Sequence, residues 1–232
     1  MTGTFYGIGV GPGDPELLTL KGKRILEECD IIATPKTKGE KDSTALNIVA
    51  PYIRGKELLE LILPMTKDRQ KLLDAWEKGT REIKDLLDQG KNVAFITLGD
   101  PSLFSTFMYV FRPLKEAGYP WGIVPGVNAP SATAAVLGCG LSDWKESLAI
   151  TAATNDLEML RETISNHDNT VLMKGAGKLS DIASLLEEMN LTDATQAVEC
   201  CSMERERVYR DIREMPGELS YFLTAIIRKG QK

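Results

Sequence analysis

The stretch GIGVGPGDPELLTLKG at residues 7–22 places four closely spaced glycines between a short apolar strand and a helix-like segment. Two similar turns follow other apolar runs, TLGDPSLFST at residues 97–106 and VPGVNAPSA at residues 124–132. Glycine at such turns permits tight backbone conformations and lets a ligand approach the main chain closely. Three turns of this kind predict a binding site built largely from backbone.

The first turn is rich in glycine, but it is not a dinucleotide-binding fingerprint. A G-x-G-x-x-G motif started at Gly7 would need its third glycine at the position of Pro12, and one started at Gly9 would need it at Asp14. We therefore expect no phosphate cradle of that kind. Two alternative interpretations remain. The glycines could serve only close packing, or the turn could belong to a nucleotide-binding regulatory module.

The composition is that of a globular protein with cores of substantial size. The chain has 232 residues, of which 43% are hydrophobic and 6% aromatic, enough for one large domain or, as we favour, two smaller ones. It has no run of eighteen apolar residues and begins directly with a strand-like segment, so we expect a cytoplasmic protein outside the membrane. The net charge of −5, with basic residues spread among acidic ones, argues against a nucleic-acid partner.

Histidine and cysteine are too few for a metal centre or a histidine-based catalytic site. The single histidine, His167, lies in a polar stretch between an expected helix and an expected strand. We predict no metal site and name no catalytic residue. The cysteines lack C-x-x-C spacing and are expected to be reduced thiols: Cys29, Cys139, Cys200 and Cys201.

Strand-like and helix-like segments alternate along the chain, which is the pattern of an α/β protein. Gly118-Tyr119-Pro120 interrupts it, and we place the boundary there, between an N-terminal α/β domain at residues 1–119 and a C-terminal one at 120–232. The first sheet is expected to be mainly parallel, and two successive strands near the end predict a mixed second sheet. Strands are expected at 5–10, 31–33, 58–63, 93–97, 121–124, 148–152, 170–174, 196–200, 207–210 and 222–227, and helices at 15–29, 43–52, 68–89, 103–117, 127–137, 156–166 and 180–189.

Two of these segments carry more specific expectations. In the helix at 68–89 the apolar residues recur at helical spacing and are expected to be core: Leu72, Leu73, Trp76, Ile83, Leu86 and Leu87. In the turn after the strand at 93–97, Asp100 is expected to cap the next helix, and Gly99 to let a ligand reach the backbone. Such turns lie outside the carboxyl ends of parallel strands, where ligands bind in open α/β sheets.

Together these motifs resemble the tetrapyrrole methylases, which are S-adenosylmethionine-dependent methyltransferases of cobalamin and sirohaem synthesis. The resemblance spans the whole chain, because VLMKGAGKL, ERERVYRDI and YFLTAIIRK follow the three turns in the family's order. It implies two α/β domains with the cofactor in a cleft between them, and a homodimer. Within the family, LPMTKDRQKLLDAWEKGTREI at 63–83 and GDPSLFSTFMY at 99–109 resemble the C-20 methyltransferases that act on precorrin-2 or cobalt-factor II, giving precorrin-3A or cobalt-factor III.

The resemblance also implies the residues that contact S-adenosylmethionine, which leaves as S-adenosylhomocysteine. They are mostly small or apolar, come from both domains, and leave the cofactor's sulfonium away from a buried cation. Phe104 stands where the subgroup often has tyrosine, and Asn128 where the family commonly has a small hydroxyl residue. The implied cofactor-binding residues are Pro12, Leu98, Gly99, Asp100, Leu103, Ser105, Thr106, Asn128, Ala129, Met173 or Lys174, and Ala225.

The substrate implied by the resemblance is an anionic tetrapyrrole, whose carboxylates favour arginine and lysine at the mouth of the cleft. Lys21, Arg205 and Arg207 are candidates, the alternative being solvated surface charges. Asp14 and Glu204 are candidates for accepting a proton near the substrate, or else are structural. The charged stretch at 36–41 is either a surface loop or a lid.

Other functions remain open at this point. The chain could methylate C-17 or C-11 of the ring, or uroporphyrinogen III, with the same fold and cofactor. It could belong to the diphthine synthase branch, whose substrate is a protein. It could also be a tetrapyrrole carrier without turnover, although a carrier has no need for a cofactor pocket.

Overall fold

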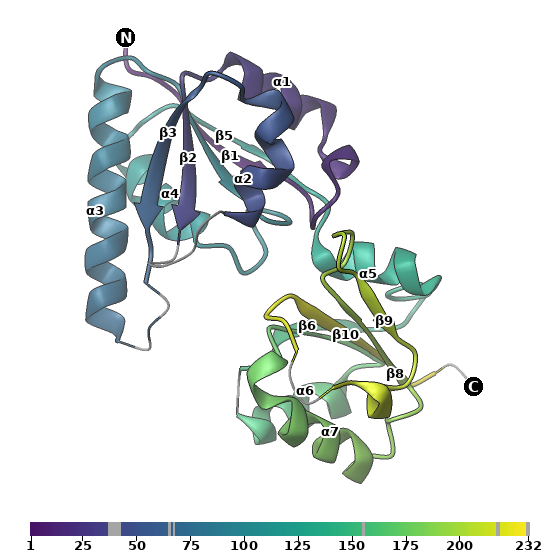
Figure 1. Ribbon diagram of the computed structural model, residues 1–232. Helices are drawn as coiled ribbons and strands as arrows, with labels where there is room; N and C mark the ends of the chain where they lie inside the picture. Colours follow the sequence, from purple (N-terminus) through teal and green to yellow (C-terminus); the bar gives the residue numbers. More distant parts are fainter. Residues whose placement is uncertain (37–42, 65, 67, 155, 217–218, 231–232) are drawn as a thin grey trace. The chain divides into compact units, whose positions relative to one another are not determined.

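The computed structural model describes residues 1–36, 43–64, 66, 68–154, 156–216 and 219–230. The chain divides into two compact units, Met1–Asn128 and Ala129–Lys232 (Figure 1). The expected boundary at 119/120 precedes strand β5 (Trp121–Val124), and this strand pairs with β1 (Phe5–Gly9) of the first unit. That pairing explains why the units divide further along the chain. The stretch expected at 36–41 as a loop or lid lies, beyond Lys36, outside the described residues.

The first unit is a parallel sheet with helices on both faces (Figure 1). Its strands have the order β3-β2-β4-β1-β5, and every pair among them is parallel. The remaining strands are β2 (Ile31–Lys36), β3 (Glu57–Ile62) and β4 (Val93–Thr97), and the helices are α1 (Leu20–Glu28), α2 (Thr44–Val49), α3 (Arg69–Asp88) and α4 (Phe107–Glu116), with 3₁₀ turns at Pro15–Leu17 and Ala50–Tyr52.

Two apolar cores form on the two faces of this sheet because β4 is buried on both, as its continuous apolar run predicts. One core gathers Phe5, Phe95 and Phe107 beneath α3 and α4, with Phe5 and Phe107 stacked at 5.5 Å between ring centroids. The other packs α1 and α2 against the opposite face. Gly7 makes room for the Phe107 ring, since a Cβ there would lie 2.3 Å from Phe107 Cζ.

Helix α3 has clear start and stop signals. Asp68 caps it by accepting the N–H groups of Gln70 and Lys71 at 3.1 and 3.3 Å, and Gly90 ends it with a φ of 82°. Ile83 and Leu87 are fully buried as expected. Leu73 is not a core residue, because 43% of it is exposed on the side of α3 away from the sheet core.

The second unit contains a mixed sheet of order β6-β7-β10-β8-β9. Strands β6 and β7 pair in parallel, whereas the β7–β10, β10–β8 and β8–β9 pairs are antiparallel, as expected for this half of the chain. Helices α6 and α7 cover one face over an apolar core, and α5 contacts β8 and β10. The elements are α5 (Ala129–Leu137), β6 (Leu148–Ala152), α6 (Leu157–Asn166), β7 (Asn169–Met173), α7 (Leu179–Glu188), β8 (Thr195–Glu199), β9 (Arg207–Tyr209) and β10 (Leu223–Arg228), with 3₁₀ turns at Ala176–Lys178 and Ile212–Glu214.

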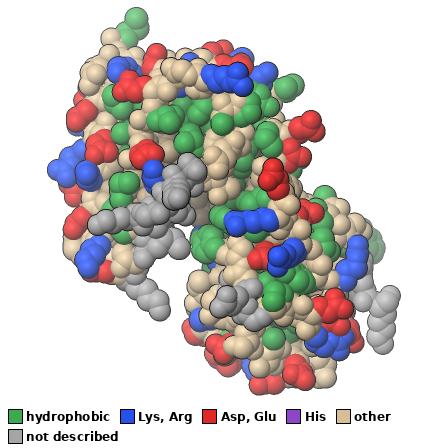
Figure 2. All heavy atoms as spheres, viewed as in Figure 1, with side chains coloured by type: hydrophobic (Ala, Val, Ile, Leu, Met, Phe, Trp, Pro, Cys, Tyr) green, Lys and Arg blue, Asp and Glu red, His purple; other side chains and the backbone are tan. Residues whose placement is uncertain are grey.

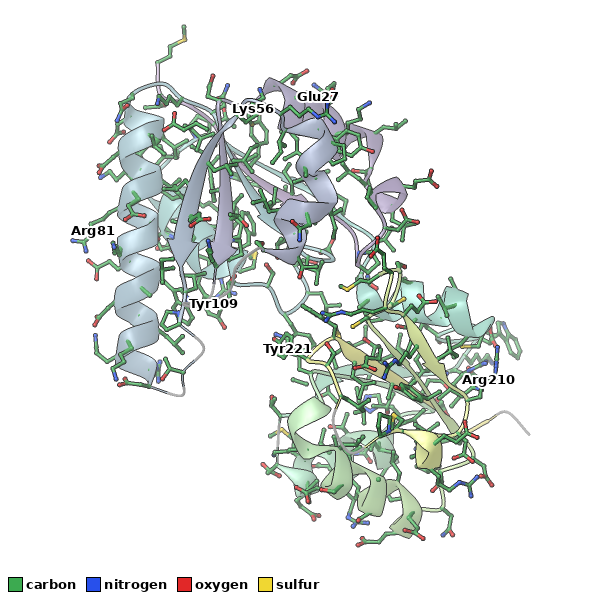
Figure 3. All side chains as sticks on the ribbon, viewed as in Figure 1. Glu27, Lys56, Arg81, Tyr109, Arg210 and Tyr221 are labelled. Carbon is green, nitrogen blue, oxygen red and sulfur yellow. The ribbon has the colours of Figure 1, made fainter. Side chains whose placement is uncertain are left out.

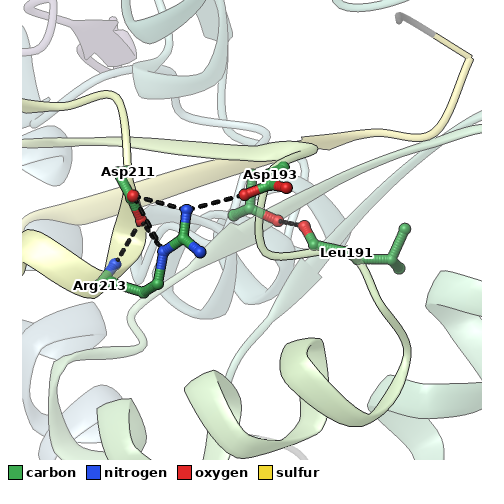
Figure 4. A network of polar contacts seen from close by, with 5 residues as sticks. Leu191, Asp193, Asp211 and Arg213 are labelled. Carbon is green, nitrogen blue, oxygen red and sulfur yellow. Dashed lines mark hydrogen bonds and ion pairs between the residues drawn. The ribbon is translucent and has the colours of Figure 1, made fainter.

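Polar contacts fix the connections of the second unit. Figure 4 shows Arg213 between Asp211, whose carboxylate oxygens lie 2.8 and 2.9 Å from Arg213 Nε, and Asp193 at 2.8 Å from Nη2. This contact ties the turn after β9 to the segment before β8. No helix among the described residues has the length and apolar character needed to span a bilayer.

Candidate functional site

The three glycine- and proline-rich loops leave neighbouring strands of the first sheet. β4, β1 and β5 lie side by side and run in the same direction, and the loops at 98–106, 10–14 and 125–128 follow their carboxyl ends. The topology therefore brings all three loops to one edge of the sheet. This is the edge at which ligands bind in open parallel sheets.

Glycines allow the backbones of these loops to meet. Gly11 and Gly99 form an isolated bridge, in which the N–H of Gly99 donates to the carbonyl of Gly11 at 2.8 Å. A Cβ at Gly126 would lie 2.2 Å from the carbonyl oxygen of Gly99, and one at Gly9 would lie 2.6 Å from the same oxygen. No side chain fits there without a shift of the backbone. The main chains of the three loops therefore pack directly against one another. Pro12, in the first of these loops, is buried.

Asp100 holds two of the loops together. Its Oδ2 accepts the N–H of Gly126 at 2.9 Å, and its Oδ1 accepts the N–H of Ser102 at 2.8 Å and the hydroxyl of the same serine. The expectation that Asp100 caps the following helix is wrong. Its carboxylate instead bridges the loops after β4 and β5.

The helix after this loop starts later than expected. It begins at Phe107 rather than Leu103, because Ser105 Oγ accepts the N–H of Phe107 at 3.1 Å. The same hydroxyl lies 2.9 Å from Thr97 Oγ1, at the end of β4. Residues 101–106 therefore form an irregular turn in which Phe104 has a φ of 49°, and Leu103, Ser105 and Thr106 are half-buried.

The second unit carries the other predicted cofactor residues. Ala129 is the first residue of α5, and Met173 is the last of β7, where its carbonyl accepts the N–H of Ala153 at 2.7 Å. Lys174 follows in the left-handed region, with a φ of 62° and its Nζ 5.7 Å from the centroid of the Tyr221 ring. Ala225 lies on β10 between Leu172 and Ala197, and its side chain faces the core under α6 and α7.

The predicted substrate residues come from both units. In the first unit, Asp14 Oδ1 accepts the N–H of Glu16 at 2.8 Å and caps a 3₁₀ turn, while Lys21 is exposed on α1. In the second unit, Glu204 and Arg205 are exposed in the turn after β8, and Arg207 is exposed on the edge strand β9. Acidic and basic side chains are intermingled over the face seen in Figure 2.

Sequence reasoning missed a buried carboxylate at the end of β8. Glu199 is 8% exposed; its Oε1 accepts the N–H of Ser220 at 2.5 Å and its Oε2 accepts the hydroxyl of Tyr209 at 3.1 Å. Burial, followed by this hydrogen bond, raises the pKa of Tyr209. Glu199 thus fixes the entry to β10, next to Tyr221, which Figure 3 labels. The Lys174 Nζ lies over the ring of Tyr221. A glutamate directly after the apolar pair Ala197-Val198, at the end of a strand, was the available signal.

The cysteines are free thiols, three of them buried. Burial, with a smaller contribution from Asp30, raises the pKa of Cys29 to about 12, and burial also raises the pKa of Cys201. These two thiols therefore stay protonated near neutral pH and are poor nucleophiles. No group of three or more His, Cys, Asp and Glu side chains within the described part of the chain is arranged to hold a metal ion.

The fold and the loops define a two-unit α/β protein in which glycine-rich loops meet at the carboxyl edge of a parallel sheet. Residues 4–215 match the family model of the tetrapyrrole (corrin/porphyrin) methylases. The chain belongs to this family.

Its relatives include proteins named for one particular ring position. A probable cobalt-precorrin-2 C(20)-methyltransferase of Methanocaldococcus jannaschii is 41% identical over 73% of this chain and 71% of the relative. The cobalt-precorrin-2 C(20)-methyltransferase of Salmonella typhimurium is 32% identical over 99% of this chain and 98% of the relative.

Solved structures share the fold. A uroporphyrin-III C-methyltransferase from Thermus thermophilus, solved with S-adenyl homocysteine, superimposes with a TM-score of 0.69 at 23% identity over 98% of each chain. A putative cobalamin synthesis related protein from Corynebacterium diphtheriae superimposes with a TM-score of 0.77 at 20% identity over 100% of each chain. At these identities the comparison establishes the fold.

Proposed function

We propose that this chain transfers a methyl group from S-adenosylmethionine to C-20 of a precorrin-2-type tetrapyrrole in cobalamin biosynthesis. The observation that carries the proposal is the full-length similarity, at 32% identity over 99% of the chain, to a methyltransferase named for that ring position. A precorrin-4 C(11)-methyltransferase is 34% identical over only 60% of the chain. The C-20 assignment is thus favoured over another ring carbon.

The loops at the edge of the first sheet suit S-adenosylmethionine. This cofactor supplies an electrophilic methyl group on a positively charged sulfur and leaves as S-adenosylhomocysteine. Residues 9–13, 98–106 and 124–128 contain no lysine or arginine, so no cation of these loops opposes that charge. The glycine contacts let the main chains of the loops pack closely, with Gly9, Gly11 and Gly99 buried. We propose that Pro12, Leu98, Gly99, Leu103 and Thr106 contact the cofactor there.

Asp100 and Ser105 would act mainly by shaping this surface. The Asp100 carboxylate is held by Gly126 and Ser102, and a carboxylate has further lone pairs with which to accept a ribose hydroxyl. Ser105 is engaged by Thr97 and Phe107. We also propose cofactor contacts from Asn128, the last residue of the first unit, and from Ala129, Met173 or Lys174, and Ala225 of the second.

The residues themselves supply alignment and exclusion of water rather than covalent chemistry. Methyl transfer to an electron-rich ring carbon forms one carbon–carbon bond as the methyl carbon–sulfur bond breaks, and the proton at C-20 then leaves to solvent or a carboxylate. Alignment in a closed site can lower such a barrier by roughly 7–11 kcal/mol in favourable cases. We propose that Lys21, Arg205 and Arg207 pair with substrate carboxylates, and that Asp14 and Glu204 lie near the ring.

The finer assignment concerns cobalt in the substrate ring. The relatives at 41% and 32% identity are named for cobalt-precorrin-2, whereas a precorrin-2 C(20)-methyltransferase of Sinorhizobium sp is 25% identical over 97% of the chain. We therefore propose the cobalt-containing ring as the preferred substrate, methylated by a cytoplasmic homodimer.

The test is to incubate the protein with methyl-labelled S-adenosylmethionine and, in parallel, with cobalt-factor II and metal-free precorrin-2. We expect label at C-20 by NMR, with faster transfer to the cobalt-containing ring. Label at another ring carbon would refute the C-20 assignment while leaving the family intact. Cofactor binding without methylation of either ring would favour a carrier or a protein substrate.

A further inference from the structure

The carboxylate of Glu199 is a buried group that the proposed methyl transfer does not use. It lies at the end of β8, and its two oxygens bond to two different segments. Oε1 accepts the N–H of Ser220, before β10, and Oε2 accepts the hydroxyl of Tyr209 on β9. Burying a carboxylate is costly unless its oxygens are hydrogen-bonded. Both oxygens of Glu199 thus hold a neighbouring segment in place.

The first of these segments carries Arg207. In the β8–β9 pair Arg207 lies directly opposite Glu199, and Tyr209 follows two residues later on the same face of β9. The Tyr209 hydroxyl donates to Glu199 and has the Arg207 side chain as a second hydrogen-bonding partner. A phenolic hydroxyl can donate one hydrogen bond and accept another. The exposed Arg207 on the edge strand is therefore tied to a buried carboxylate.

The second segment carries Tyr221, which contacts Lys174. Main-chain bonds hold Tyr221 on both sides. The N–H of Ser220, before it, donates to Glu199 at 2.5 Å, and the carbonyl of Phe222, after it, accepts the N–H of the residue that follows Glu199 at 2.9 Å. The Nζ of Lys174 lies over the Tyr221 ring, 5.7 Å from its centroid, in a cation–π contact. Glu199 therefore fixes the aromatic ring against which this lysine rests.

The two cations lie along one edge of the second sheet. Strand β7 ends at Met173, immediately before Lys174, and β9 begins at Arg207; the antiparallel pairing with β10 and β8 brings these strand ends to the same edge. β10 and β8 lie between β7 and β9, so the two outer strands are three strand spacings, roughly 14 Å, apart. A single carboxylate cannot bridge that distance. The edge therefore suits a ligand that carries several carboxylates.

We propose that Glu199 is a positioning residue for the substrate, which holds Arg207 and Lys174 so that each pairs with a different carboxylate of the ring. This inference rests on the proposed function, in which the substrate is an anionic tetrapyrrole. The cations make the charge-assisted contacts, whereas Glu199 and Tyr209 act through them without touching the ring. Long basic side chains lose rotamer freedom when they bind, and holding them beforehand reduces that loss.

The test is a double-mutant cycle on the affinity for the octacarboxylate uroporphyrin, measured by fluorescence titration. We expect Arg207→Ala to lower this affinity roughly tenfold, and Tyr209→Phe, which removes the hydroxyl between Glu199 and Arg207, to lower it roughly fivefold. In the Arg207→Ala background Tyr209→Phe should have no further effect, because it acts through that arginine. The matched control is Tyr119→Phe in the first unit, which removes a hydroxyl bonded to Asp88 at 2.6 Å and should keep the wild-type affinity.

Glu199→Gln tests the group that both segments share. Glutamine offers one oxygen and one amide in place of two acceptor oxygens, so the contact to either Ser220 or Tyr209 is lost. We expect a loss of uroporphyrin affinity of roughly fivefold or more. Part of this loss should persist in the Arg207→Ala background, because Lys174 is held separately. With cobalt-factor II as substrate, KM should rise while kcat changes little.

Two further measurements separate positioning from a general loss of structure. Circular dichroism checks that each variant is folded, and the affinity for S-adenosylhomocysteine should stay at the wild-type value. Additive effects of Tyr209→Phe and Arg207→Ala, wild-type uroporphyrin affinity in Glu199→Gln, or an equal loss of affinity for both ligands would each overturn the proposal. Failure of the proposed function is a different result, namely wild-type protein that transfers no label to C-20 of either ring.

Discussion

Gly126 is the residue at which the loops tolerate least change. A Cβ at this position would lie 2.2 Å from the carbonyl oxygen of Gly99, a backbone atom that a rotamer change cannot move. We expect Gly126→Ala to destabilise the protein by about 1–3 kcal/mol, the usual cost of overpacking, and to weaken S-adenosylhomocysteine binding. Urea unfolding and calorimetric titration measure the two effects.

Gly79→Ala is the matched control for that substitution. A Cβ at Gly79 would meet Leu61 at an ordinary 3.4 Å inside helix α3, where alanine is preferred to glycine by roughly 0.5–1 kcal/mol. This variant should equal or exceed wild type in stability and bind the ligand normally. Equal behaviour of the two variants would contradict the tight contact of the three loops.

Asp100 allows the structural and ligand-contacting roles of a single carboxylate to be separated. Asparagine presents one acceptor oxygen and one amide, so Asp100→Asn must lose an acceptor toward either Gly126 or Ser102. We expect the affinity for S-adenosylhomocysteine to fall about tenfold or more. The measurement is repeated with adenosine and 2′-deoxyadenosine. Equal loss for both nucleosides assigns Asp100 to loop shape alone, whereas a larger loss for adenosine assigns it a ribose contact.

At the scale of elements, periodicity predicted the strands and helices well, but contacts distant in sequence set their ends and neighbours. Local capping potential at Asp100 predicted a helix from Leu103, whereas the carboxylate is taken by Gly126, 26 residues away. The interruption of the strand–helix pattern at Gly118-Tyr119-Pro120 predicted a domain boundary, yet strand β5 beyond it completes the first sheet. The sequence could not predict the exposure of Leu73 for a similar reason. The spacing of apolar residues marks one face of a helix, but it does not say how much of that face a neighbouring helix covers.

The start of β6 makes the second unit sensitive to acid. The pKa of Asp168 is held below its usual value because its carboxylate accepts the backbone N–H and the hydroxyl of Ser147, and the pKa of Glu146 is lowered by the N–H of Asp143 and the amide of Asn169. A lowered folded-state pKa stabilises the fold above the unfolded value and loses that effect as pH falls through the folded value.

We therefore expect the urea midpoint of the second unit to fall as the pH decreases from roughly 5 to 3. This range spans the ordinary pKa values of aspartate and glutamate, which lie near 4. Asp168→Asn and Glu146→Gln should each lower the midpoint at pH 7 and flatten its pH dependence. Glu162→Gln, at an exposed carboxylate of α6, serves as the control and should keep the wild-type profile. A wild-type slope in Asp168→Asn would show that these hydrogen bonds do not set the acid response.

At the scale of the whole molecule, the proposed cofactor contacts come from two units with separate cores. A ligand that binds only the folded state stabilises it by about 2.7 kcal/mol at a hundredfold excess over its dissociation constant. If residues of both units bind S-adenosylhomocysteine, its addition should slow hydrogen exchange in β4 of the first unit and in β7 of the second. Exchange measured by mass spectrometry on peptides covering these strands resolves the two units. Protection confined to β4 would remove Ala129, Met173, Lys174 and Ala225 from the cofactor site. The reason is that a ligand bound only by the first unit does not stabilise the second unit against opening.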